Sequence, residues 1–150
     1  MSSIANAISF ADTNANPELH VLGDVIRPLV TPIMGGRLEL FDLRGVAGNG
    51  PVPHAHPWDE AYVILDGTVA IIEGNSEREV GPGDSVMIPA DTVHAYRITS
   101  DQARFLVATT GHGLGSFFTD VDTLVKEMPR DLGTLVEVAK RNGLTSPLFP

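Results

Sequence analysis

The sequence contains no cysteine. Without thiols the chain can form no disulfide bond, no thiolate metal site and no cysteine nucleophile. An absence of cysteine also suits a protein kept in a reducing compartment. The chemistry of this chain must therefore come from other side chains.

Long apolar runs are also missing. No stretch approaches the roughly 18 residues that a membrane-spanning helix needs. The first ten residues hold no lysine or arginine ahead of an apolar run, so they make a poor secretory signal. We expect a cytoplasmic protein with no membrane partner.

Positive charge is scarce. The chain has 10 lysines and arginines against 19 aspartates and glutamates, which gives a formal net charge of −9. Phosphate backbones repel a chain of this charge on average, and its basic residues form no cluster. We expect no nucleic-acid partner.

The composition that remains is typical of one globular domain. Of the 150 residues, 43% are hydrophobic and 19% are charged. We expect three parts within this domain: an N-terminal arm over residues 1–18, a barrel over 19–112 and a helical extension over 113–150. The arm is either loosely held or exchanged as a strand with a partner subunit.

Residues 19–112 are rich in signals for short strands. Runs of β-branched and aromatic residues are separated by glycine, proline, asparagine and aspartate. Asp66-Gly67 lies between two apolar runs and predicts a tight hairpin. Many short strands at this spacing predict an all-β sandwich or barrel. The expected strands cover residues 19–22, 25–31, 37–44, 52–56, 60–66, 69–73, 77–80, 85–88, 93–98 and 104–110.

Two short helices are expected after the barrel. The first begins at Asp120 or Asp122, which can cap it, and ends at Pro129. The second begins at Asp131 and ends near Gly143. These helices either cover one mouth of the barrel or pack on its outside.

Three of the five histidines and one glutamate form a pattern. Residues two apart on a strand point to the same face, so His54 and His56 present both imidazoles to one side. Glu60 enters the next expected strand, and His94 comes from a later strand that a closed sheet can bring opposite. His20 and His112 lie outside this pattern and are expected on the surface.

Three neutral imidazoles and one carboxylate suit a divalent transition metal, with positions left for water or substrate. Iron, manganese, nickel, cobalt, copper and zinc all accept such ligands. The alternative is a barrel in which these groups satisfy one another by hydrogen bonds, without a metal.

Several neighbouring side chains are candidates for a substrate pocket, although packing in the interior explains each of them as well. Trp58 can stack on an aromatic substrate or fill the barrel rim. The tyrosines can hydrogen-bond a substrate or find partners in the core. The candidates are Trp58, Tyr62, Ile64, Tyr96 and Phe105.

The pattern resembles the two conserved motifs of the cupin superfamily, over roughly residues 19–112. The second motif departs from the usual residues at Asp91 and Ile98, and neither is an expected ligand. The stretches 21–24 and 117–120 look like those of small quercetin-dioxygenase-like cupins. The matching positions are Gly48, His54, His56, Glu60 and Gly67 in the first motif and Gly83, Pro89 and His94 in the second.

This resemblance implies a jelly-roll barrel, also called a double-stranded β-helix, and a small-molecule substrate. It favours an O₂-dependent dioxygenase that cleaves a hydroxylated aromatic or a diketone, with Glu60 as both ligand and catalytic base. The alternatives are a non-redox isomerase, cyclase or lyase, and a ligand-binding cupin without turnover. Small cupins commonly pair, so we expect a homodimer.

Overall fold

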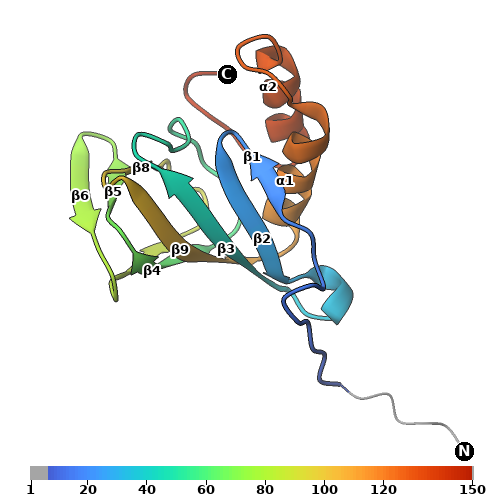
Figure 1. Ribbon diagram of the computed structural model, residues 1–150. Coiled ribbons are helices and arrows are strands. Elements are labelled where there is room, and N and C mark those ends of the chain that lie inside the picture. Colours follow the sequence, from blue (N-terminus) through green and yellow to red (C-terminus); the bar gives the residue numbers. More distant parts are fainter. Residues whose placement is uncertain (1–6, 150) are drawn as a thin grey trace, which may run out of the picture.

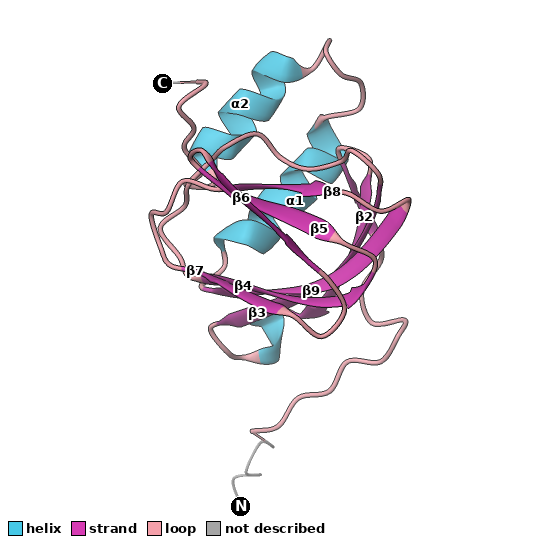
Figure 2. Cartoon of the chain, turned by 90° about the vertical axis from the view of Figure 1, so that its left-hand side faces the viewer, coloured by secondary structure: helices cyan, strands magenta, loops and turns pink. Residues whose placement is uncertain are grey.

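The computed structural model describes residues 7–149, which fold into two antiparallel sheets followed by two helices (Figure 1). The larger sheet has the strand order β1-β2-β3-β9-β4-β7, and the smaller has the order β6-β5-β8. Figure 2 shows the two sheets facing each other across the interior. The strands are β1 Leu19–Val21, β2 Asp24–Val30, β3 Leu38–Val46, β4 Glu60–Asp66, β5 Val69–Glu73, β6 Ser76–Val80, β7 Ser85–Ile88, β8 Ala95–Ile98 and β9 Gln102–Thr110.

This arrangement confirms the predicted jelly-roll barrel with two helices after it. One expected strand, over residues 52–56, is wrong. There the backbone forms only two isolated bridges, from His54 to His94 and from Ala55 to Thr145. Pro51, Pro53 and Pro57 explain the difference, because a proline has no N–H to donate to a strand ladder.

The turn at Asp66-Gly67 also differs from the prediction. It joins β4 to β5, but β4 pairs with β7 and β9, whereas β5 pairs with β6 and β8. The chain therefore crosses here from one sheet to the other instead of forming a hairpin. Gly67 has φ 76°, and a Cβ on it would lie 2.1 Å from the carbonyl oxygen of Gln102. Only glycine fits this crossing.

Helix α1, Gly113–Leu124, starts earlier than expected, and Asp120 and Asp122 lie inside it. Its start was missed because His112 precedes it without a side-chain cap. The helix is marked instead by its buried apolar residues, which recur at i, i+3, i+4 and i+7 and so share one face. Those buried residues are Leu114, Phe117, Phe118 and Val121.

Helix α2, Leu132–Arg141, agrees with the prediction. Gly143 follows it with φ 86°, as a terminating glycine does. The Asp131 side chain, however, accepts hydrogen bonds from the backbone N–H groups of Lys126 and Glu127, at 2.8 and 2.9 Å. Asp131 therefore fixes the turn between the helices.

Helix α1 packs on the larger sheet at the strands β1 to β3. The Phe118 ring meets the Phe41 ring edge to face, with 5.2 Å between centroids. The Asp122 carboxylate accepts a hydrogen bond from the His20 N–H at 2.8 Å, so it covers part of an edge strand. The first turn of α1 lies close against the Trp58 ring. A Cβ on Gly113 would lie 2.2 Å from Cζ3 of Trp58.

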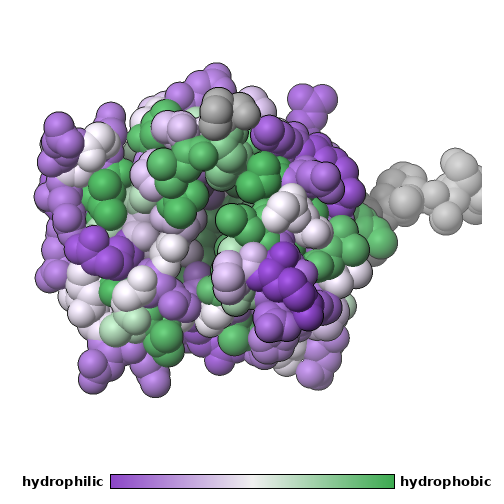
Figure 3. Space-filling view, turned by 90° about the horizontal axis from the view of Figure 1, so that it is seen from above, coloured by the Kyte–Doolittle hydropathy of each residue, from purple (hydrophilic) through white to green (hydrophobic). Residues whose placement is uncertain are grey.

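The surface is mixed. Seen from above, apolar residues lie around a central hollow and polar residues lie along the outer edge (Figure 3). Exposed apolar side chains include Phe10 and Ile33. Among the described residues, no helix is long and apolar enough to cross a membrane.

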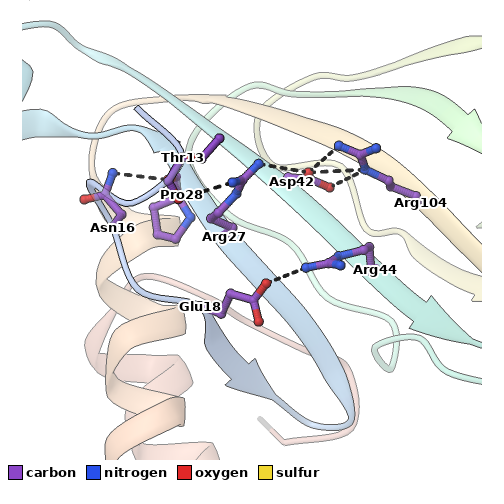
Figure 4. Close-up of polar contacts among 8 residues, drawn as sticks. All are labelled: Thr13, Asn16, Glu18, Arg27, Pro28, Asp42, Arg44 and Arg104. Carbon is purple, nitrogen blue, oxygen red and sulfur yellow. Dashed lines mark hydrogen bonds and ion pairs between the residues drawn. The ribbon is translucent and has the colours of Figure 1, made fainter. Parts of the chain in front are cut away.

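The described part of the arm runs beside β2 and β3 without forming a strand. Asn16 donates to the carbonyl oxygen of Pro28 at 3.2 Å, and Arg27 donates to that of Thr13 at 3.4 Å (Figure 4). Glu18 accepts a hydrogen bond from an arginine of β3. Residues 1–6 of the predicted arm lie outside the described residues.

Asp42 on β3 is a buried carboxylate, 3% exposed, held by arginines (Figure 4). Arg104 donates three hydrogen bonds to it, at 2.7 to 3.2 Å, and Arg27 lies 3.6 Å away. The hydrogen bonds from Arg104 hold the pKa of Asp42 below its ordinary value, even though burial acts in the opposite direction. This cluster ties β2, β3 and β9 together.

We predict that Asp42→Asn lowers the free energy of unfolding by about 1.5–3 kcal/mol at pH 7, measured by urea denaturation. The folded-state pKa is depressed, so the stabilisation is present above about pH 4 and is lost as the pH falls below it. The variant should show a flatter decline in acid. The exposed pair of Glu77 and Arg97 provides the control, because Glu77→Gln should change stability by less than about 1 kcal/mol. Equal losses in the two variants would contradict the prediction.

We also predict that Gly113→Ala destabilises the protein by about 1–3 kcal/mol, because its methyl group displaces the Trp58 ring. Trp58 is the single tryptophan, so its fluorescence spectrum should shift in the folded variant. Gly133→Ala is the matched control. Nothing lies within 4 Å of a Cβ there, and alanine in a helix should stabilise by about 0.5–1 kcal/mol. An unchanged spectrum in Gly113→Ala would refute the close contact.

Candidate metal centre

The structure brings His54, His56 and His94 together as a three-histidine cluster. One ring nitrogen from each lies within 4.8 Å of the others. His54 and His94 exchange both backbone hydrogen bonds, at 3.0 and 2.9 Å. This isolated bridge, and not a regular strand, brings the two segments together. The convergence predicted from strand spacing thus occurs.

The backbone fixes the orientation of all three rings. The Nδ1 atoms of His54 and His94 lie 2.8 Å from the carbonyl oxygens of Val52 and Thr92. The Nδ1 atom of His56 lies 3.0 Å from the carbonyl oxygen of Trp58. A carbonyl oxygen only accepts, so each Nδ1 carries a proton, and a ring that is neutral keeps its lone pair on Nε2. Such second hydrogen bonds are typical of metal-binding histidines.

Glu60, the first residue of β4, completes the group. Its Oε1 lies 3.2 Å from Nε2 of His94 and 3.6 Å from Nε2 of His56. The Tyr62 hydroxyl donates a hydrogen bond to the same oxygen at 2.7 Å. The predicted set of three histidines and one glutamate therefore lies around one point.

Charge is unevenly distributed in this site. Burial lowers the pKa of His54 to about 4, so that ring is neutral at pH 7. Burial acts to raise the pKa of Glu60, but contacts with His56 and His94 outweigh it and lower the pKa to about 2. Burial acts to lower the pKa of His94, but its hydrogen bond with Glu60 outweighs burial and raises that pKa. Burial raises the pKa of Tyr62 well above its ordinary value, so its hydroxyl stays protonated.

These residues fit a cation. The imidazole Nε2 atoms and the ionised carboxylate point at one space, so positive charge must lie between them, either as a proton on His94 or as a bound metal ion. Nε2 of His56 is buried and has no hydrogen-bond partner among the described residues. A buried polar atom in that state requires an explanation, and a metal ion supplies one. Three nitrogens and one oxygen suit a transition metal better than calcium or magnesium.

The indole of Trp58 packs on the cluster. Its ring stacks on that of His56 with 4.6 Å between centroids and an angle of 6°. The benzo edge of the indole faces Gly113, so Nε1 on the opposite edge points away from α1. Nε1 is buried without a partner in the described chain. Trp58 thus packs against the three-histidine cluster, and its part in a substrate pocket stays a prediction.

Thr109 was not anticipated from the sequence. Its Oγ1 is also buried without a partner in the part of the chain described, and it pairs with Glu60 across β4 and β9. Only the strand register places it on the interior face, and no local motif marks it.

The other pocket candidates lie deeper. Phe105 is fully buried, with its ring 5.3 Å from those of both Tyr62 and Tyr96. The Tyr96 hydroxyl donates to the buried carboxylate of Asp24 at 3.0 Å. Ile64 is in the same core. Of the five candidates, Trp58 and Tyr62 touch the expected ligands.

A tight turn holds His56 and Asp59, the residue before Glu60. The Asp91 N–H donates to the carbonyl oxygen of His56 at 2.8 Å, and the Ala90 N–H donates to the Asp59 side chain at 2.9 Å. Asp91 has φ 63°, in the left-handed region where aspartate is tolerated. This explains how aspartate can stand where the resemblance leads one to expect glycine.

Comparison with known proteins agrees with this geometry. Residues 45–109 match the family described as Cupin domain. The quercetin 2,3-dioxygenase of Bacillus subtilis (strain 168) is 29% identical over 72 residues. The match covers 47% of this chain but only 21% of that protein.

Solved structures share the fold at low identity. The polyketide cyclase RemF from Streptomyces resistomycificus has a TM-score of 0.60 and 22% identity, over 69% of this chain and 79% of its own. KdgF from Halomonas sp. has a TM-score of 0.61 and 17% identity, over 69% of this chain and 95% of its own. Together with the match of residues 45–109 to the Cupin domain family, these likenesses show that the chain has a cupin fold.

Proposed function

We propose that this protein is a metal-dependent enzyme, an O₂-dependent dioxygenase that cleaves a small hydroxylated aromatic or a diketone. The observation that carries the proposal is the convergence of three imidazole Nε2 lone pairs on an ionised glutamate that is hydrogen-bonded by Tyr62. The likeness of part of the chain to a quercetin dioxygenase supports the choice of substrate class. The metal would be one divalent ion of iron, manganese, nickel, cobalt, copper or zinc.

Some of these residues would hold the metal ion, and one of them would transfer a proton. His54, His56, His94 and Glu60 would bind the ion, which would supply Lewis acidity and, for a redox metal, electron transfer to O₂. Glu60 accepts the proton of a substrate hydroxyl at its carboxylate, and the substrate is thereby activated. The Tyr62 hydroxyl keeps that carboxylate in place. Both oxygen atoms of O₂ enter the substrate, so no external reductant is consumed.

Non-redox chemistry is the second candidate, and the contact of Tyr62 with Glu60 favours it. A protonated hydroxyl 2.7 Å from an ionised carboxylate forms a donor and acceptor pair suited to isomerisation, cyclisation or lyase chemistry. A cupin that only binds a ligand would use the same residues without turnover. The homodimer and the cytoplasmic location stay predictions.

The first prediction from this proposal concerns the metal. The purified protein should hold one divalent transition metal per chain, measured by mass spectrometry of the elements. His94→Ala should weaken metal binding by at least about 100-fold, because one ligand is lost. His112→Ala is the control, since that exposed ring lies outside the cluster. Equal metal content in both variants would exclude the proposed ligands.

The second prediction concerns oxygen. The metal-loaded protein should consume O₂ with a flavonol or a β-diketone in an oxygen electrode. Glu60→Gln should lower kcat by about 10²–10⁴-fold, because the base is removed. Exposed Glu77→Gln should match the wild type. A metal-loaded protein that converts a substrate without consuming O₂ would instead support the non-redox candidate, and one with no turnover would support a binding protein.

A further inference from the structure

A cavity of about 380 Å³ lies outside the three-histidine cluster, between α1 and the strands β2 and β3. This volume is within the range of small-molecule sites. We call it the α1 groove. It is lined by Pro28, Thr31, Pro32, Glu39, Phe41, His112, Gly115, Ser116, Thr119 and Asp120.

The unusual member of the α1 groove is Glu39, a carboxylate that is only 2% exposed. Its Oε1 accepts one hydrogen bond, 3.3 Å long, from the Gly115 N–H at the start of α1. Its Oε2 lies where a Cβ on Gly115 would be 2.1 Å away, so glycine makes room for it. Burial raises the pKa of Glu39, against the smaller effects of Gly115 and the His112 ring.

Comparison with Asp42, three residues along the same strand, shows what Glu39 lacks. Asp42 is buried to the same degree but receives three hydrogen bonds from an arginine. Within residues 7–149, Glu39 has no ion pair with lysine or arginine. A buried carboxylate is unfavourable unless donors or positive charge compensate it, and one long hydrogen bond leaves most of that requirement unmet.

We propose that the α1 groove binds a small organic cation, a primary ammonium on an apolar body, with the ammonium on Glu39. An ammonium supplies both the charge and the donors that the carboxylate lacks. Pro28, Pro32 and Phe41 offer apolar surface for the rest of the ligand. The net charge of −9 favours the approach of cations.

The α1 groove lies close to the candidate metal centre but shares no ligand with it. Glu39 pairs with Thr109 on β9, and Thr109 pairs with Glu60 on β4. Two strand spacings place the Cα atoms of the two glutamates about 10 Å apart. The proposal therefore holds whether or not the centre binds a metal.

The test is calorimetric titration of the full-length protein with benzylammonium as the probe. The wild type should bind it saturably at one site per chain, and Glu39→Gln should bind at least about tenfold more weakly. Asp120→Asn removes one charge at the same groove but should change the affinity less than about twofold. Benzyl alcohol, the neutral counterpart, should not bind. No saturable binding, or equal weakening in both variants, would overturn the proposal.

A second measurement does not depend on any variant folding. In a two-dimensional NMR spectrum of the wild type, the Gly115 amide should shift as benzylammonium is added, because its N–H bonds to the Glu39 carboxylate. The Gly133 amide, on the other helix, should not move. Binding that leaves the Gly115 amide unchanged would place the ligand elsewhere and refute the site.

Discussion

The pair of backbone hydrogen bonds between His54 and His94 is the contact on which the candidate centre depends. It joins a proline-rich segment, which cannot form a regular strand, to the residue just before β8. Because each imidazole Nδ1 is also held by a carbonyl oxygen two residues away along the chain, backbone position translates directly into ring orientation. Main-chain contacts thus set the orientation of the three histidines, whereas the Tyr62 side chain holds the Glu60 carboxylate.

The buried carboxylates of this barrel differ in the hydrogen-bond donors and positive charges that compensate them. Arginine hydrogen bonds lower the pKa of Asp42, whereas Asp24 has only neutral donors, so burial dominates and raises its pKa. Glu60 is surrounded by imidazoles and a tyrosine, a set that a cation would complete. Among residues 7–149, the Glu39 carboxylate accepts one hydrogen bond, from the Gly115 N–H at the start of α1. Glu39 is the least compensated of these carboxylates, and it is the one that we propose binds a ligand in the α1 groove, where an unmet polar requirement calls for an explanation.

Sequence reasoning succeeded where the signal is local. The spacing of His54, His56 and Glu60 is short, and the strand periodicity around it is regular, so both the barrel and the convergence could be predicted. It failed where contacts between residues far apart in the sequence determine the local structure. The turn at Gly67 crosses between sheets because of a close approach to the Gln102 backbone, which lies far along the chain. Helix α1 has no side-chain cap at its start, so only tertiary burial of its apolar face reveals where it begins.

The first turn of α1 links the two sites. Gly113 admits the Trp58 ring that stacks on His56, and Gly115 admits the carboxylate of Glu39. Trp58 and Glu39 lie in different parts of the barrel, so two independent contacts fix the position of the start of α1. A side chain at either glycine would push the helix away from one contact and strain the other. Helix α1 is therefore the element that contacts both the ring packed on the candidate metal centre and the carboxylate of the α1 groove.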